Sequence, residues 1–250
     1  MISKRGIVAL VTETNTKPRT ARERVRIELT NEIKDVARKQ LAVHGSAGLS
    51  LRAVAREVGM VSSAVYRYFP SRDELLTALI IDAYEAVGAA VNAAESRVRR
   101  GDFNGRWLAA CDALRQWALA DPHEYSLIFG SPVPGYRAPQ DTVDPATIVP
   151  VVLLRILTDA DAAGVTTAPI GRPLPRSVRG DLERLRETTA SSLSHEALVR
   201  AIMAWTHLIG AVSFELFGHL HNVIDDFDAY FDVQMRVVGA SLGLSPKRGE

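Results

Sequence analysis

Apolar residues recur every three or four positions along most of the chain, and no stretch alternates apolar and polar residues with a period of two. The first long stretch shows the pattern clearly over residues 21–44, where one helical face would carry Val25, Leu29, Ile33, Val36, Ala37 and Leu41. Gly45 and Gly48 follow and end that helix. The pattern therefore predicts an all-α protein.

Capping residues and helix breakers divide the rest of the chain into further helices. Ser50 and Ser62 precede two short apolar patterns and are predicted as N-caps. The segment "SRDE" is a capping box at Ser71 that starts a long helix, and Gly101 ends it. Two stretches rich in Pro, Gly and Thr are predicted as irregular, residues 130–139 and 166–177. The predicted helices span 51–58, 62–68, 72–100, 103–120, 122–129, 145–163, 195–220 and 225–242.

Two short helices that cross at a tight turn are predicted around Gly59. Val54 and Val58 share one face of the first helix, where Val65 of the second can meet them. Gly59 can adopt the left-handed conformation that ends a helix, and Pro70 stops the second helix. A three-residue turn containing Gly is typical of a helix-turn-helix. The second helix is about two turns long, which suits insertion into a DNA major groove.

Burial of one face of this second helix leaves a polar face exposed. Arg67 and Ser62 are predicted to read base edges, whereas Arg52 and Arg72 are predicted to hold phosphates. Each residue alone could be a surface side chain without a role, or core-edge packing for the tyrosines, but together they favour DNA contact. The predicted DNA-contacting residues are Ser50, Arg52, Ser62, Ser63, Ala64, Tyr66, Arg67, Tyr68, Arg72, Arg22 and Arg24.

Charge is distributed unevenly between the two ends of the chain. Residues 1–72 hold 14 Lys or Arg and 6 Asp or Glu, and residues 73–250 hold 16 and 23, although the whole chain carries only +1. A basic module that meets a polyanion, joined to an acidic body, explains this split, and chance clustering of solvated charges is the alternative. The predicted domains are a disordered basic tail over 1–19, a helix-turn-helix domain over 20–72 and a helical body over 73–250.

The residues of the predicted helix-turn-helix resemble the N-terminal domain of the TetR family of bacterial one-component transcription regulators. The quoted segment is "VSSAVYRYFPSRDELL", and the family pattern has Tyr, an aromatic residue or His, Phe and then Lys or Arg after a short turn. Here these are Tyr66, Tyr68, Phe69 and Arg72. The resemblance covers about residues 20–76.

The resemblance extends more weakly into the body. The segments "GSPVPGYRAP" and "AWTHLIGAVSFELFG" are similar to an actinobacterial-type subgroup of the family. Membership implies an all-α homodimer that binds a palindromic operator on double-stranded DNA, usually as a repressor. It also implies release of the operator when a small molecule enters the C-terminal domain, so residues 73–250 become the predicted ligand-sensing and dimerisation domain.

The helix predicted over 195–220 is apolar on more than one side. Trp205, Leu208, Val212 and Leu216 form one stripe, and a second stripe includes His207. One stripe can face the core and the other then needs a partner, unless the helix is buried wholly within the monomer. The residues predicted at a dimer interface are Gly210, Ala211, Phe214, Phe217, Phe227, Phe231 and Val238.

An aromatic stripe in the body is the predicted effector site. Trp107, Cys111 and Leu114 are spaced i, i+4, i+7 and share one helical face. Such a stripe is more often solid core, but in a sensing domain it can line an apolar cavity for a small, largely apolar ligand. The residues predicted to contact this ligand are Phe103, Trp107, Cys111, Leu114, Tyr125, Met203 and His207.

Several function classes find no support in the sequence. One cysteine excludes an intramolecular disulfide, and no apolar run approaches 18 residues without a charge. The apolar run from Ile7 to Val11 is shorter than a secretory core needs. We therefore predict a cytoplasmic protein with no membrane partner. No metal-ligand spacing and no Gly-rich phosphate loop is present, so no enzyme, metal or cofactor is predicted.

One alternative from another class stays open at this point. The helical body could serve an enzyme or a carrier, with the basic segment incidental. Sequence-selective, salt-dependent binding to DNA separates the two hypotheses, because only the regulator predicts it.

Overall fold

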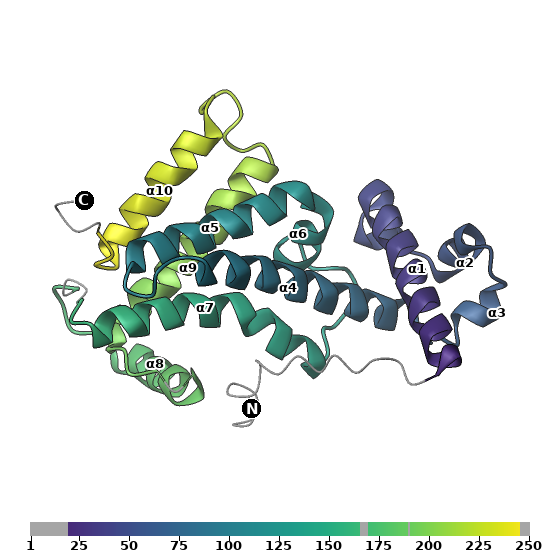
Figure 1. The fold of residues 1–250 in the computed structure, drawn as a ribbon, viewed down its shortest axis with the longest axis horizontal. Coiled ribbons are helices and arrows are strands. Elements are labelled where there is room, and N and C mark those ends of the chain that lie inside the picture. Colours follow the sequence, from purple (N-terminus) through teal and green to yellow (C-terminus); the bar gives the residue numbers. More distant parts are fainter. Residues whose placement is uncertain (1–19, 166–169, 190, 246–250) are drawn as a thin grey trace. The chain divides into compact units, whose positions relative to one another are not determined.

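Helices make up all the regular structure in the computed structural model, which describes residues 20–165, 170–189 and 191–245 (Figure 1). The predicted all-α class is confirmed. The predicted tail, residues 1–19, lies outside the described residues. The elements in chain order are α1 (Ala21–His44), η1 (Ser46–Gly48), α2 (Leu51–Val58), α3 (Ser62–Val65), α4 (Arg72–Ser96), α5 (Phe103–Ala120), α6 (Pro122–Phe129), η2 (Gln140–Thr142), α7 (Val143–Ala162), α8 (Arg176–Thr189), α9 (His195–Leu216) and α10 (Phe227–Ser241).

The start of α1 is fixed by a capping box that the sequence reading missed. The Glu23 amide donates to the Thr20 hydroxyl at 3.1 Å, and the Thr20 amide donates to the Glu23 carboxylate at 2.8 Å. Two amides that the helix leaves without partners are thereby satisfied. The helix begins at Ala21, as predicted.

The helix predicted over 62–68 begins at the predicted residue, but its predicted end and its predicted N-cap are wrong. α3 covers only Ser62–Val65, and its N-cap is Val61 rather than Ser62. The amides of Tyr68 and Phe69 both donate to the Val65 carbonyl, at 2.9 and 3.0 Å, and close the chain into a turn. Pro70 therefore follows a turn and not a helix.

Two later helix predictions also need correction. α4 ends at Ser96 and not at residue 100, because the next two amides bond carbonyls three residues back. α8 was not predicted at all, and its first two residues fall in the stretch predicted as irregular. Its 14 residues are mostly polar, with Leu182 as the one buried side chain in the helix, so the apolar repeat is too sparse to read.

The chain divides into two units, each with its own packing. The first comprises, among the described residues, 20–85 and 121–146. Its core joins Ile33 of α1, Val54 of α2, Val65 of α3 and Leu75 of α4, all fully buried. Residues 73–85 share this unit, and the domain boundary predicted at residue 72 stays a prediction.

Charged side chains also fasten α1 within the first unit. Arg38 donates to Asp82 of α4 and to Glu124 of α6, both at 2.6 Å, and Lys34 lies 2.8 Å from the same Asp82. These groups are partly buried, so solvent screens their attraction less than at an open surface. The cluster ties α1 to two other helices of the unit.

The second unit comprises, among the described residues, 86–120, 147–165, 170–189 and 191–245. Within it α5 packs against α9 and α10, and α8 packs against α9. Arg106 of α5 is fully buried and donates to Glu95 at 2.6 Å. Burial raises the pKa of Glu95, but hydrogen bonds from Arg106 and Arg100 outweigh this and leave it below its ordinary value.

Candidate functional site

The turn between α2 and α3 has the geometry of a helix-turn-helix. Gly59 adopts φ +77°, in the left-handed region that favours glycine, and its amide donates to Arg56 O. The Met60 amide donates to the Ala55 carbonyl at 2.8 Å and closes the end of α2. Val54 and Val65 are fully buried across the turn, as their spacing predicts.

Residues 62–67, which form α3 and the start of the turn after it, hold several of the predicted DNA-contacting residues. Ser62, Ser63 and Arg67 are exposed, and Tyr66 is 43% exposed. Ala64 is half-buried. These exposed side chains lie on both sides of Val65, which is fully buried in the core.

Val61 stands beside them and was missed by the sequence reasoning. Its side chain is 71% exposed at the N-cap of α3, where no side chain makes a capping hydrogen bond. The signal that could have found it is an apolar residue at a position that normally favours Ser, Thr, Asp or Asn.

Tyr68 differs from its predicted neighbours because it packs inward. It is half-buried against the core of the first unit, and the Arg26 guanidinium lies 5.4 Å from the centre of its ring. A cation over an aromatic face is a stabilising contact. The structure therefore gives Tyr68 a packing role beside α1.

Arg72 lies at the start of α4, where its guanidinium is directed at the protein's own backbone. It donates to Ser46 O at 2.6 Å and to Leu49 O at 3.1 Å, and it lies 3.5 Å from Asp73. These bonds hold the turn that leads into α2. Arg72 therefore positions that turn, and its role as a phosphate contact stays a prediction.

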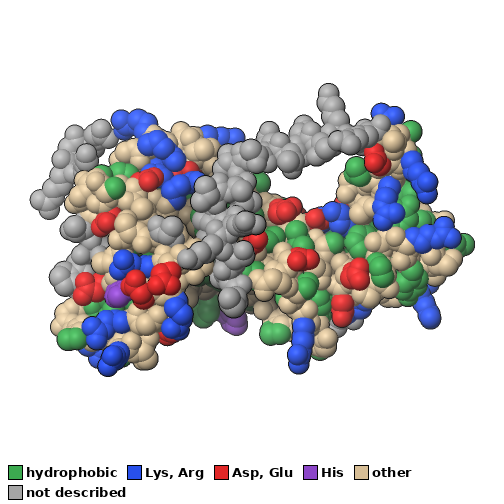
Figure 2. Space-filling model, turned by 90° about the horizontal axis from the view of Figure 1, so that it is seen from below, with side chains coloured by type: hydrophobic (Ala, Val, Ile, Leu, Met, Phe, Trp, Pro, Cys, Tyr) green, Lys and Arg blue, Asp and Glu red, His purple; other side chains and the backbone are tan. Residues whose placement is uncertain are grey.

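The remaining predicted contacts lie on α2 and at the start of α1. Arg52, Arg22 and Arg24 are exposed, and Ser50 is the N-cap of α2 but makes no side-chain capping bond. Figure 2 shows Lys and Arg side chains on the part of the surface formed by α1 to α3, at the right of the view. A basic surface around an exposed α3 suits a phosphate backbone.

The predicted effector residues are only partly brought together. Trp107, Cys111 and Leu114 are buried side by side in the second unit, and the indole of Trp107 donates to the Met235 carbonyl at 2.8 Å. Burial, with a smaller contribution from Asp112, raises the pKa of the Cys111 thiol well above its ordinary value, which makes it unreactive.

Four members of the predicted effector set lie elsewhere. Phe103 is half-buried with the Arg106 guanidinium 5.9 Å from its ring centre. Met203 is 62% exposed on α9, and His207 is exposed and bonded to Gln234 at 3.0 Å. Tyr125 belongs to the first unit, where it packs on Phe129.

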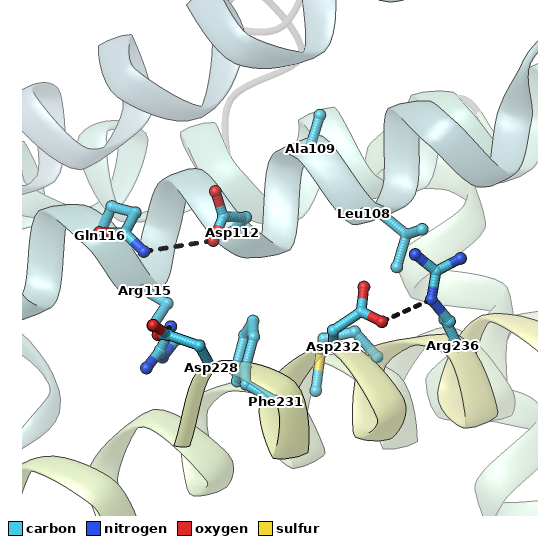
Figure 3. Close-up of a pocket in the computed structure, with 10 residues that line it drawn as sticks. Leu108, Ala109, Asp112, Arg115, Gln116, Asp228, Phe231, Asp232 and Arg236 are labelled. Carbon is cyan, nitrogen blue, oxygen red and sulfur yellow. Dashed lines mark hydrogen bonds and ion pairs between the residues drawn. The ribbon is translucent and has the colours of Figure 1, made fainter. Parts of the chain in front are cut away.

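A pocket of about 340 Å³ lies between α5 and α10, on the side of α5 next to the buried stripe. Figure 3 shows side chains of the two helices facing each other across it. Its apolar lining includes Leu108, Phe231 and Met235, and its rim carries both charges. Arg115, at one end, donates to Glu215 and Asp228 and lies 5.2 Å from the Phe231 ring centre.

The predicted dimer residues divide into exposed and covered positions. Phe214 and Phe217 are 52% and 47% exposed, whereas Phe231 is buried in its own chain beneath Arg115. Gly210, Ala211, Phe227 and Val238 are half-buried. The exposed apolar face of α9 and α10, called the α9–α10 face below, consists of Ile202, Met203, Phe214, Phe217, Tyr230, Val233 and Val237.

By length and composition alone, α9 would also pass as a membrane-spanning helix, with a mean hydropathy of 1.5 over its most apolar window. Only 28% of that window is buried. A helix that packs against partner helices through two faces meets the same test, so this property adds little weight to a membrane role.

Both parts of the chain match known families. Residues 33–79 match the family described as bacterial regulatory proteins, tetR family, and residues 107–238 match the tetracyclin repressor-like C-terminal domain. The HTH-type transcriptional regulators Rv1816 of Mycobacterium tuberculosis and Mb1846 of Mycobacterium bovis are each 38% identical over 231 residues, which cover 90% of this chain and 95% of theirs. The chain belongs to the TetR family of transcriptional regulators.

Solved structures agree with this TetR assignment. The crystal structure of the Streptomyces protein SCO4313 is 36% identical, with a TM-score of 0.71, and covers 88% of this chain and 98% of that one. A protein of unknown function from Rhodococcus sp. RHA1, at 22% identity and a TM-score of 0.62 over 86% of this chain and 93% of that one, shares the fold.

Membership in the TetR family decides between the two function classes left open by the sequence. TetR proteins are DNA-binding regulators and not enzymes, which confirms the prediction that the chain has no enzymatic function. The TetR N-terminal match contains α2 and α3 with their exposed residues, while Arg22 and Arg24 precede it.

Proposed function

We propose that this TetR protein is a cytoplasmic repressor that binds a palindromic operator as a homodimer and releases it when a small, largely apolar ligand enters the C-terminal domain. The observation that carries the proposal is the exposed polar surface of α3 and the turn after it, where Ser62, Ser63, Tyr66 and Arg67 flank the buried Val65 of the helix-turn-helix. Such side chains supply the donors and acceptors that read a major groove.

Homodimer formation is supported by the α9–α10 face. It exposes side chains as large as Phe214, Phe217 and Met203 on adjacent helices of one unit. Large exposed apolar patches mark sites of protein contact, and a two-fold pairing of two helices per subunit buries such a patch in a four-helix seam. Phe231, covered within its own chain, is left out of the seam.

The ligand site is proposed at the buried stripe of α5, reached from the pocket between α5 and α10. Met235 lies between the pocket and the buried stripe, since it lines the pocket and its carbonyl accepts a hydrogen bond from the Trp107 indole. A ligand that enters from the pocket and separates α5 from α10 would break this hydrogen bond and fill the space beside Cys111 and Leu114. By linkage, such a ligand weakens operator binding by the factor by which the operator weakens ligand binding.

The experiment that tests the function is DNA binding with the purified full chain. Randomised duplexes are selected by binding, and the chain is titrated onto the enriched duplex, a scrambled duplex and duplexes from its own gene neighbourhood. We expect a palindromic site with half-sites about one DNA turn apart and an affinity that falls with salt. Failure to enrich any sequence would contradict the proposal.

The dimer is tested by light scattering on the same preparation. The unmodified chain should give twice the chain mass of 27.3 kDa, and Phe214→Glu should give the single mass because it places a charge in the apolar seam. Leu119→Glu is the matched control, since Leu119 is an exposed apolar residue of α5 outside the seam. A monomeric unmodified chain would contradict the dimer.

A further inference from the structure

We propose that Val61 contacts the 5-methyl group of one thymine in each operator half-site and so sets the base preference at that position. The inference rests on the proposed DNA-binding function. It adds an apolar contact to a recognition surface that is otherwise polar and basic, and it names the chemical group that the contact recognises.

Val61 differs in exposure from the two apolar residues that precede it. Val58 and Met60 pack against the core of the first unit, but Val61 is 71% exposed. Its backbone is extended at φ −67° and ψ 140°, and the chain turns into α3 directly after it. The side chain therefore lies directly before the recognition helix with most of its apolar surface exposed.

Val61 occupies the N-cap position of α3, where its side chain cannot form a capping hydrogen bond. An N-cap position favours Ser, Thr, Asp or Asn, whose side chain accepts from a first-turn amide, and this cap is worth about fivefold in the folding equilibrium. Val61 makes no such bond. A position where a locally unfavourable residue brings no folded-state benefit points to a contact with another molecule.

The chemistry of the neighbouring residues favours DNA as the molecule that Val61 contacts. The exposed residues that follow Val61 in the chain are mostly polar or basic, with Ser62, Ser63 and Arg67 among them, so a partner with a broad apolar surface does not fit. The major groove offers one apolar group on the base edges, the methyl group of thymine. Valine, with two methyl groups and no polar atom, can bury it without leaving a donor or acceptor unpaired.

The experiment replaces thymine by deoxyuridine, which lacks only that methyl group. The duplex enriched by selection is remade with a single deoxyuridine at each thymine of a half-site, and dissociation constants are measured at one salt concentration. The proteins are the unmodified full chain, Val61→Ala and Val61→Ser. Val43→Ser is the matched control, because Val43 is 75% exposed on α1.

We expect the unmodified chain to bind about fourfold more weakly when the methyl group is absent at one position of a half-site, the factor for one buried methyl group. Val61→Ala and Val61→Ser should show a ratio near one at that position, while Val43→Ser keeps the fourfold ratio. Val61→Ser should also unfold at the same or a higher temperature, since it restores the cap, so weaker binding cannot be ascribed to misfolding.

Two results would overturn the inference while leaving the regulator intact. One is an unmodified chain that binds a selected duplex but shows no sensitivity to deoxyuridine at any position. The other is a pair of Val61 variants that keep the full thymine preference. Absence of sequence-selective binding by the unmodified chain would instead overturn the proposed function, and this inference with it.

Discussion

Arginine side chains lie in two contrasting surroundings in this protein. In the second unit, Arg106 and Arg115 are buried and bonded to carboxylates, and Arg115 donates through all of its nitrogens to Glu215 and Asp228. On the helix-turn-helix, Arg52 and Arg67 are exposed and have no partner among the described residues. The difference separates arginines whose donors are satisfied within the protein from arginines whose donors are available to another molecule.

Arg72 shares features with both the bonded and the exposed arginines. It lies in the basic module, yet backbone carbonyls already accept two of its hydrogen bonds. Arg72 lies five residues after Arg67 in the same basic segment, but its guanidinium, like those of the buried arginines, has hydrogen-bond acceptors within the protein. Three substitutions, taken from the largest expected effect to the smallest, test whether hydrogen-bond satisfaction assigns these roles correctly.

Arg106→Met should cause the largest change and act on stability alone. It removes the main partner of Glu95, which is 1% exposed, so we expect a loss of about 3 kcal/mol in the free energy of unfolding. Urea denaturation measures it. Arg155→Met, which removes a half-exposed partner of the same carboxylate, is the control and should cost under about 1 kcal/mol. An equal loss in the free energy of unfolding for Arg106→Met and Arg155→Met would contradict the distinction between buried and exposed arginines.

Arg67→Ala should leave the unfolding midpoint unchanged and weaken operator binding. A side chain that reads a base contributes about 1–3 kcal/mol, and its loss relaxes the preference at one base pair of each half-site. Repeating the duplex selection with the variant measures both effects. If specific and scrambled duplexes weaken by the same factor, Arg67 contacts phosphate and not a base.

Arg72→Ala should have the smallest effect on binding and a different signature. Loss of its bonds to Ser46 and Leu49 should lower the free energy of unfolding by about 1–2 kcal/mol, because this guanidinium is partly exposed. Operator affinity should fall modestly while the dependence on salt keeps its slope. A slope that becomes shallower by about one unit would instead show a phosphate contact.

Local pattern was enough to predict the helix-turn-helix. The bounds of α1 and α2 match the predicted ranges, and Gly59 takes the left-handed conformation expected of it. These features depend on residues within a few positions of one another, where helical spacing and capping chemistry act directly. The burial of Val54 and Val65 followed from the same spacing.

The features that sequence reasoning missed depend on partners far along the chain. The carbonyls that accept from Arg72 lie 23 and 26 residues earlier, so no local pattern predicts these two hydrogen bonds. Phe231 is covered because Arg115 of α5 packs over its ring, which no spacing within α10 reveals. Met203 and His207 fall on the exposed face of α9 because only tertiary packing decides which stripe faces the core.

The two hydrogen bonds from Arg72 to the backbone also have a consequence for protein engineering. Arg72 donates to the main-chain oxygens of residues 46 and 49, so these two hydrogen bonds do not depend on which side chain occupies position 46. Neither bond involves residues 61–67. Substitutions at exposed positions among residues 61–67 should therefore leave the two Arg72 hydrogen bonds intact. A library confined to Val61, Ser62, Ser63, Tyr66 and Arg67 should yield regulators with new operators that keep the parent scaffold and its response to ligand.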